Sequence, residues 1–363
     1  MIALVATNLA HRPTRTVLSI LLIGVPVTLM LTLVGLSRGF VEDTTVRTRG
    51  IGADIIVRSP DASIGSLALS NMPEKLVDRL EKIPHVTMAT GVASHLVSGW
   101  TAVSGIDVPK FEKMSRGFSF REGHGFERPD DILVDTYFAQ QAKVHAGSTL
   151  KLFNRNWHVA GVVEPGKLAH IFLPLNVVQD LDGTNGKVAQ IYLKVDDPAN
   201  VQSVIGELSK LIPNYHVYPV DELISLTSVD NVPFLRPFLN VIIGVAVLIG
   251  AAVASLSMYM AIMQRTREIG ILKSLGASKY WIVRIILLEA LCLGLGGSIL
   301  GILLSFVSRW SLAKLVPASL PQAIVPSWWP IAAGIAIGAA IVGALYPGII
   351  AARQDPIEAL AYE

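Results

Sequence analysis

Charged residues are scarce in this chain of 363 residues, since Asp, Glu, Lys and Arg make up only 16% of it. Ordinary soluble domains carry about 25%. Apolar residues reach 52%, and the mean hydropathy is +0.53. This composition excludes an ordinary soluble protein and indicates a large membrane part. The formal net charge of +2 is too small to argue for nucleic-acid binding.

Cysteine is almost absent as well. The single cysteine, Cys292, lies inside an apolar run, so no disulfide can form within the chain. Seven of the eight histidines are scattered over the middle of the chain, none at the close spacing of a zinc site. His95 and His124 are candidates for ligand binding, but a solvated or core position is the simpler interpretation. We therefore predict no catalytic, cofactor or metal site in this chain.

Four long apolar runs predict four transmembrane helices, because about 20 residues cross a hydrocarbon core. The runs cover residues 17–40, 237–262, 282–307 and 328–352. The first is too long for the core of a cleaved signal peptide and lacks a small-residue cleavage site. We expect a retained helix, with residues 1–16 in the cytoplasm. The distribution of Lys and Arg also places residues 353–363 there, and residues 308–327 outside.

Between the first two runs, residues 41–235 regain charge and alternate between strand-like and helix-like patterns. Residues 150–153 and 157–163 read as a hairpin around residues 154–156. Residues 201–212 repeat apolar side chains with the helical period. The predicted fold is an α-helical membrane protein with four transmembrane helices and an inserted extracytoplasmic mixed α/β domain.

The loop of residues 263–281 is short, basic and helical in pattern, so it should be cytoplasmic. Ile269, Leu272 and Leu275 recur at three-residue spacing and predict one apolar ridge. Arg265, Arg267, Glu268 and Lys273 supply charges of both signs around it. Gly276 gives a place to stop the helix, and Ser278 ends the predicted coupling segment. A helix lying on lipid carries mainly basic residues, so Glu268 favours a protein groove. A solvated turn is the simpler alternative.

Two features of the predicted spans are open to two interpretations. Glu289 lies about two turns into the third span, where an acid is costly. It either makes a structural or coupling contact with protein, or lies near the headgroups. The pairs Gly297–Gly301 and Gly334–Gly338 have the spacing that lets helices approach closely. They serve packing within one subunit or, alternatively, between subunits.

Two enzyme-like motifs are set aside. Residues 161–168 nearly match a phosphate-binding loop, but Leu168 replaces the hydroxyl residue that would bind Mg²⁺, and the predicted site is outside the cell. Residues 35–39 match G-x-S-x-G, but they end a membrane span instead of following a strand. Both matches are attributed to chance.

The segment R-T-R-E-I-G-I-L-K-S-L-G-A-S, residues 265–278, resembles the cytoplasmic loop of MacB/FtsX-like ABC transporter permeases. Residues 351–360 resemble the C-terminal motif of the same family. The resemblance implies a non-enzymatic membrane subunit, with ATP and Mg bound by a partner ATPase. It also implies ATPase coupling through residues 265–278, and a second cytoplasmic contact through Arg353, Asp355, Pro356 and Glu358.

The resemblance further implies a dimer, with itself or a paralogous permease, in the inner membrane. A periplasmic adaptor is another candidate partner. The spans carry few charges, which argues against a hydrophilic pore and for transmission of movement to the external domain. The expected substrates are lipids, lipoproteins, peptides, drugs or haem. The alternative is a signalling permease that moves nothing and activates a cell-wall hydrolase, but its external domain is typically smaller.

Overall fold

The computed structural model describes residues 13–60, 72–98, 101–226, 235–315 and 321–353, together with Val5, Thr7 and Ala10. These residues form two compact units, and the division in the first long helix falls after Ser37. One unit contains the long apolar helices and the other a mixed α/β fold. The fold class predicted from the sequence is therefore confirmed.

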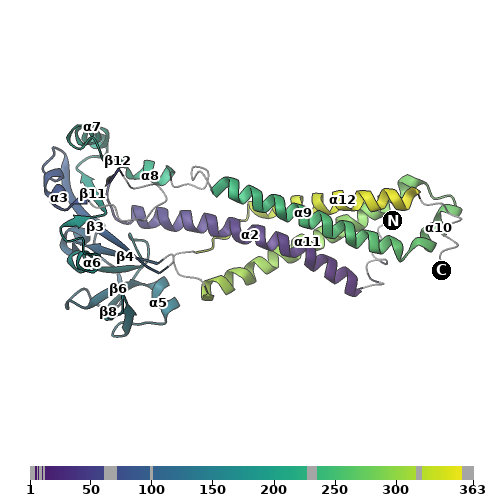
Figure 1. Ribbon diagram of the computed structural model, residues 1–363, viewed down its shortest axis with the longest axis horizontal. Coiled ribbons are helices and arrows are strands. Elements are labelled where there is room, and N and C mark those ends of the chain that lie inside the picture. Colours follow the sequence, from purple (N-terminus) through teal and green to yellow (C-terminus); the bar gives the residue numbers. More distant parts are fainter. Residues whose placement is uncertain are drawn as a thin grey trace. The chain divides into compact units, whose positions relative to one another are not determined.

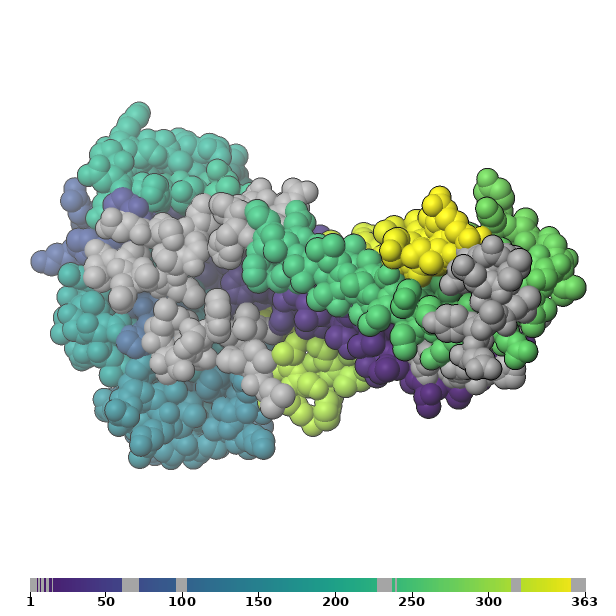
Figure 2. All heavy atoms as spheres, turned by 45° about the vertical axis from the view of Figure 1, so that its right-hand side comes forward, coloured from purple at the N-terminus to yellow at the C-terminus, as the bar shows by residue number. Residues whose placement is uncertain are grey.

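The membrane unit is built from long helices, each apolar enough over its length to cross a membrane. They are α2 (Pro13–Arg49), of which the residues up to Ser37 belong here, α9 (Leu235–Met263), α11 (Lys279–Leu315) and α12 (Trp328–Arg353). A short helix, α10 (Thr266–Ser274), connects α9 to α11. Helices α9 and α12 lie side by side (Figure 1), and the same contact is seen in the space-filling view (Figure 2).

Glycine lets α2 and α11 approach each other closely. A Cβ atom on Gly297 would lie 2.5 Å from Ile23 Cγ2, and one on Gly301 would lie 2.6 Å from Val27 Cβ. Thr28 Oγ1 adds a hydrogen bond of 3.1 Å to the carbonyl of Gly301. In this structure the Gly297–Gly301 pair thus serves packing within the chain.

The second glycine pair lies in open space. A Cβ atom on Gly334 or Gly338 would meet nothing within 4 Å. The close approach of α12 to α9 instead occurs at Gly343, where a Cβ atom would lie 2.2 Å from the carbonyl oxygen of Ala251. Gly334 and Gly338 therefore do not pack α12 within this chain.

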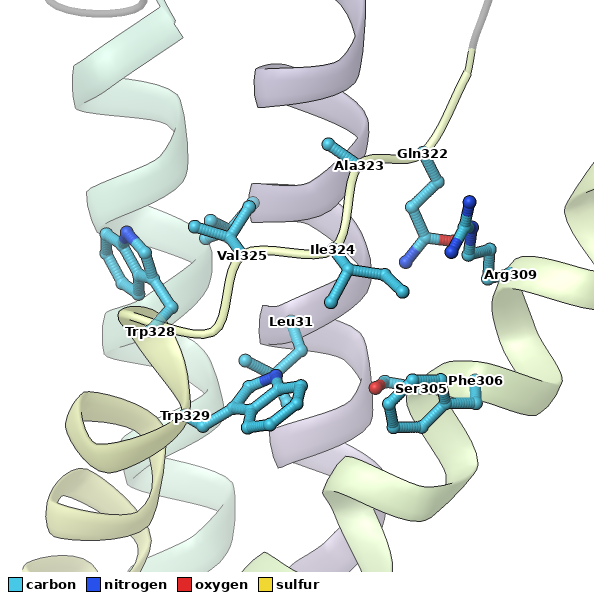
Figure 3. A pocket seen from close by; sticks show the side chains of 11 residues that line it. Leu31, Ser305, Phe306, Arg309, Gln322, Ala323, Ile324, Val325, Trp328 and Trp329 are labelled. Carbon is cyan, nitrogen blue, oxygen red and sulfur yellow. The ribbon is translucent and has the colours of Figure 1, made fainter.

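An extended segment before α12 crosses the middle of α2, near Leu31 (Figure 3). The amide of Ala323 donates to the carbonyl of Gly35 at 2.9 Å, and a Cβ atom on Gly35 would lie 2.7 Å from Ala323 O. Trp329 packs edge-on against Phe306, with ring centroids 6.0 Å apart. Gly35, which belongs to the G-x-S-x-G match, thus has a packing role, and the remaining pocket of about 20 Å³ holds little more than one water.

The α/β unit contains a ten-stranded mixed sheet in the order β12-β1-β11-β3-β4-β9-β6-β8-β5, with β7 paired to β8. Its strands are β1 (Ile55–Arg58), β3 (Val86–Ser98), β4 (Thr101–Ile106), β5 (Phe120–Gly123), β6 (Asp131–Asp135), β7 (Thr149–Leu152), β8 (Arg155–Val163), β9 (Ile171–Pro174), β11 (Gln190–Val195) and β12 (His216–Pro219). The pairs β4–β9 and β6–β8 are parallel and the others antiparallel. A separate ladder joins β2 (Met72–Pro73) to β10 (Lys187–Val188).

Both faces of this sheet are covered. Every residue of β1 and β6 is buried. Successive residues such as Ile132 and Leu133 point to opposite faces of the sheet and belong to different apolar cores. The helices of the unit are α3 (Lys75–Leu80), α4 (Val108–Ser115), α5 (Thr136–Ala142), α6 (Leu175–Asp182), α7 (Val201–Leu211) and α8 (Val220–Leu226), with a 3₁₀ turn at Pro198–Asn200. Several of them are labelled around the sheet in Figure 1.

The predicted hairpin exists, but its turn was placed one residue too late and made too long. Leu152 pairs with Arg155, so the turn consists of Phe153 and Asn154 alone. Their φ angles of 54° and 57° match a type I′ turn, whose twist suits antiparallel strands. The prediction was wrong because phenylalanine rarely adopts a positive φ, so Phe153 was assigned to the end of the strand.

Candidate functional site

The connection between α9 and α11 is a helix with defined ends. At its start, the hydroxyl of the buried Thr266 donates to the carbonyls of Ile262 and Met263, both at 3.1 Å. These are among the last carbonyls of α9, which lack partners within the helix. The hydroxyl thus closes α9 at the point where α10 begins.

Gly276 ends α10. Its φ of +94° is a conformation that glycine adopts at little cost. The amide of Gly276 bonds to Lys273 O at 3.0 Å, and that of Ala277 to Leu272 O at 2.9 Å. This pair of bonds is the Schellman motif, which satisfies the last carbonyls of a helix. The glycine that the sequence marked as a helix stop therefore lies at the end of α10.

Ser278 starts α11 two residues later. Its hydroxyl accepts a hydrogen bond from the amide of Trp281 at 3.2 Å, as the side chain of an N-cap residue does. Only four residues, 275–278, therefore lie between α10 and the helix that returns through the membrane unit. Little slack remains to absorb a movement of α10.

An ion pair ties the start of α10 to α11. Arg265 Nη2 donates to both carboxylate oxygens of Glu289, at 2.8 and 2.9 Å. The Glu289 side chain is 3% exposed and that of Arg265 20%. An ionised carboxylate this deep needs a charged partner, since its desolvation is costly. Of the two interpretations of Glu289, the structure thus shows a contact with protein.

A second polar contact ties the end of α10 to α12. Lys273 Nζ donates to the carbonyl of Ala352 at 3.0 Å. That carbonyl belongs to the last turn of α12, where a lysine caps the helix and suits its negative end. Arg353 follows as the last described residue and is exposed. Asp355, Pro356 and Glu358, predicted as a second contact, lie outside the described residues.

The predicted apolar ridge is wrong in its geometry. Ile269 packs against the core of the membrane unit and Leu272 is half-buried, while Leu275 is 80% exposed. A helix turns about 100° per residue, so each three-residue step falls about 60° short of a full turn. Ile269 and Leu275 therefore cannot lie on one ridge.

The exposed face of α10 instead follows four-residue steps. Arg267, Ile271 and Leu275 lie on it, with Ile271 45% and Leu275 80% exposed. Glu268 borders this face and is exposed as well. Just beyond, Tyr280 is 88% exposed. The sequence reasoning missed Ile271 and Tyr280, although the four-residue spacing from Ile271 to Leu275 was a readable signal.

α10 also walls a pocket of about 320 Å³. Its lining is mostly apolar and includes Ile269, Ile271 and Leu272, with Arg265, Glu268 and Glu289 as its charged residues. The structure thus brings together most of the predicted coupling residues around α10 but divides them between two faces. Ile269 and Arg265 hold α10 to its own chain, and the exposed residues are free to meet another protein.

The other sequence candidates lie in the α/β unit and find structural partners. His95 bonds to Asp182, and His124 lies 3.4 Å from Glu127. Lys167, from the near phosphate-binding motif, donates to Ser115 O at 2.7 Å and to Gly117 O. Burial lowers the pKa of the Lys167 amine. It thus caps the end of α4, and no group of residues fit to hold a metal ion occurs in the described part of the chain.

Two family models match this chain. A MacB-like periplasmic core domain matches residues 16–211, which is more than half of the chain. An FtsX-like permease C-terminal domain matches residues 240–356. The second match contains α10, the Arg265–Glu289 pair and the end of α12.

Curated relatives agree with these matches. An uncharacterized ABC transporter permease of Methanocaldococcus jannaschii is 26% identical over 272 residues, which are 68% of this chain and 66% of the relative. The macrolide export ATP-binding/permease protein MacB of Sodalis glossinidius is 25% identical over 399 residues, covering 99% of this chain and 60% of that protein. The chain thus spans about two thirds or less of the length of these relatives.

Among solved structures, the periplasmic region of MacB from Actinobacillus actinomycetemcomitans aligns with 48% of this chain and 92% of that chain. The identity is 18% and the TM-score 0.38.

Proposed function

Because this chain belongs to the MacB/FtsX-like family of ABC transporter permeases, we propose that it transmits ATP-driven movement from a separate ATPase subunit to its extracytoplasmic domain. In this proposal α10 receives the movement in the cytoplasm. The long helices carry it through the membrane, and the α/β unit performs the work outside.

The observation that carries the proposal is the way α10 is attached. It is tied to α11 by the Arg265–Glu289 pair and to α12 by the bond from Lys273 to Ala352. It also presents Ile271 and Leu275 to the outside. A displacement of α10 must therefore move two long helices. An ordinary solvated turn would need neither the ties nor the exposed apolar face.

We further propose export or extraction of a hydrophobic or extracytoplasmic substrate. Glu289 is the only acid in the four predicted spans, and Arg265 neutralises it, which disfavours a hydrophilic path through the bilayer. The match of residues 16–211 to a MacB-like periplasmic core domain favours transport over the signalling alternative. One relative is named for macrolide export, and drugs or lipids of comparable hydrophobicity are the candidates here.

The proposed assembly is a dimer of this chain, or of this chain and a paralogue, with ATPase subunits on the cytoplasmic side of the inner membrane. Single cysteines at the exposed Lys113 and Lys279, in a chain whose Cys292 is replaced, test the orientation. A membrane-impermeant maleimide should label position 113 but not position 279 in intact cells. The reverse pattern would rule out the proposed topology.

Leu275→Asp tests the coupling directly. If Leu275 is desolvated against the ATPase, a carboxylate there costs at least about 2 kcal/mol, which is roughly thirtyfold in affinity. The ATPase subunit that co-purifies with the tagged chain from its native host should be lost, and its stimulated ATP hydrolysis should fall. Membrane insertion should remain normal.

Leu211→Asp is the matched control, because Leu211 is also exposed, at 44%, but belongs to the α/β unit. It should leave co-purification of the ATPase unchanged. If Leu275→Asp retains the ATPase as well as the control does, α10 is only a turn between two spans.

A further inference from the structure

His170 is buried where the end of α2 meets the loop between β8 and β9. Its ring is 4% exposed, and Nδ1 lies 2.5 Å from Asp135 Oδ2. The amide of Asp135 also donates to the carbonyl of His170 at 2.9 Å. The other oxygen of Asp135 accepts from the amide of Phe138 at 2.8 Å, capping α5. His170 and Asp135 thus hold each other in place.

These contacts determine which ring nitrogen carries the proton. A carboxylate only accepts hydrogen bonds, so Nδ1 of His170 must donate to Asp135. In the neutral ring Nε2 is then an acceptor. That atom is buried without a hydrogen-bond partner, and Asp43 Oδ2 lies 3.9 Å from it. A neutral His170 therefore turns one acceptor toward another.

The charged groups around the His170 ring also favour a proton on it. Asp43 pairs with Arg47 at 2.6 Å on α2, and the edge-on ring of Tyr137 from α5 covers His170 at a centroid distance of 6.5 Å. Two carboxylates, Asp43 and Asp135, face one guanidinium. The cluster carries one negative charge while His170 is neutral and none when it is protonated. Burial makes such an uncompensated charge costly.

The same place joins α2 to the sheet through the backbone. The amide of Leu168 donates to Arg47 O at 3.0 Å, and Arg47 Nη1 reaches Leu168 O at 3.5 Å. A Cβ atom on Gly50 would lie 1.7 Å from Gly166 O, so the two backbone segments are in contact without intervening side chains. We call Asp43, Arg47, Leu168 and His170 the α2 joint.

We propose that His170 makes the α2 joint sensitive to pH. Protonation places a hydrogen on Nε2 and turns the contact with Asp43 into a charge-assisted hydrogen bond, after a closure of about 1 Å. Histidine is the side chain that changes charge between pH 5 and 8. The joint therefore tightens in acid and loosens as the pH rises through that range. If the α/β unit lies outside the cytoplasm, as proposed above, external pH sets this state.

Hydrogen exchange of the purified full-length chain tests the proposal without requiring a partner ATPase. Overlapping peptides isolate the amide of Leu168 at several pH values between 5 and 8, and each rate is divided by that of the unfolded chain at the same pH. From pH 8 to pH 5 the protection should rise about tenfold, the factor expected for one charge-assisted hydrogen bond. His170→Asn keeps a donor toward Asp135 but cannot titrate, so protection should become independent of pH.

Asp43→Asn removes the negative charge and supplies an amide that can donate to the neutral Nε2, so it should also flatten the profile, which keeps the test decisive if His170→Asn misfolds. His158→Asn is the matched control. His158 pairs with Asp131 at 2.7 Å in the same sheet but does not touch the joint. The His158→Asn variant should keep the tenfold rise in protection of the Leu168 amide. A wild-type protection that does not change with pH, or a rise that persists in both joint variants, overturns the proposal.

Discussion

The two units of this chain are stabilised by different means. In the α/β unit large side chains such as Trp157, Phe111 and Phe172 are completely or almost completely buried, and the hydrophobic effect stabilises them. In the membrane unit Gly297 and Gly343 bring helices into backbone contact. Other large apolar residues there, such as Leu248 and Leu256, are exposed, because lipid is as apolar as a protein core and burial gains little.

Polar contacts are also distributed differently. The α/β unit contains several carboxylate–histidine pairs, including His158–Asp131 and His170–Asp135. In the described part of the membrane unit the one ion pair is Arg265–Glu289, beside α10. The comparison teaches that the paired charges in the described part of the membrane unit lie beside α10, the helix proposed to receive movement. The predictions below test both halves of this comparison, from the largest effect to the smallest.

Trp157→Ala should have the largest effect, because it empties a buried site and leaves Leu152 O without its 3.1 Å partner. We expect the free energy of unfolding of a fragment of residues 42–230 to fall by about 3–5 kcal/mol, measured by urea titration with circular dichroism. Leu248→Ala in the full chain removes a side chain that is 70% exposed in the membrane unit. It should leave the melting temperature in detergent nearly unchanged, and equal losses would erase the contrast between the units.

Glu289→Gln should have the second largest effect. It leaves Arg265 without a counter-charge in a buried site, which typically costs about 3 kcal/mol. The melting temperature in detergent and the stimulation of the co-purified ATPase should both fall. Glu207→Gln changes an exposed acid of the α/β unit and serves as the control. If the two variants behave alike, the ion pair does not hold α10.

Gly297→Ala should cost about 1–3 kcal/mol, since the new methyl group would lie 2.5 Å from Ile23 Cγ2. Gly334→Ala places the same group in open space and, with a better helix former, should be neutral or slightly stabilising. Thermal unfolding of both variants in one detergent makes the comparison. A loss on Gly334→Ala that is absent in a monomeric preparation would instead reveal packing between subunits.

Asp131 should give the smallest effect, visible only in acid. Burial raises the pKa of its carboxyl, but hydrogen bonds from His158 and from the amides of Glu127 and Arg128 outweigh this and hold the pKa below its ordinary value of 3.8. Because the folded-state pKa is the lower one, this stabilisation is present above pH 4 or so and is lost as the pH falls through the folded-state pKa. Asp131→Asn should flatten that acid dependence, measured by urea unfolding of the fragment. Asp221→Asn, at an exposed ion pair, should retain it.

Much of this architecture could be predicted from local pattern. The four spans follow from uninterrupted apolar runs, and Gly276 indicated the end of a helix. The partner of Glu289 could not be predicted, because Arg265 lies 24 residues away and only the path of α10 brings them together. The parallel pairing of β6 with β8 was equally hidden, since both strands are buried on two faces and show no alternation.

The central claim is that the outward face of α10, and not its inner face, meets the ATPase. A photo-crosslinking amino acid placed singly at Ile271, Leu275, Ile269 and Leu272 tests it in cells that contain the ATPase. We expect crosslinks to the ATPase from positions 271 and 275, which are exposed, and none from positions 269 and 272, which are half-buried against the chain itself. Crosslinks from 269 and 272 alone, or from no position, would contradict the account.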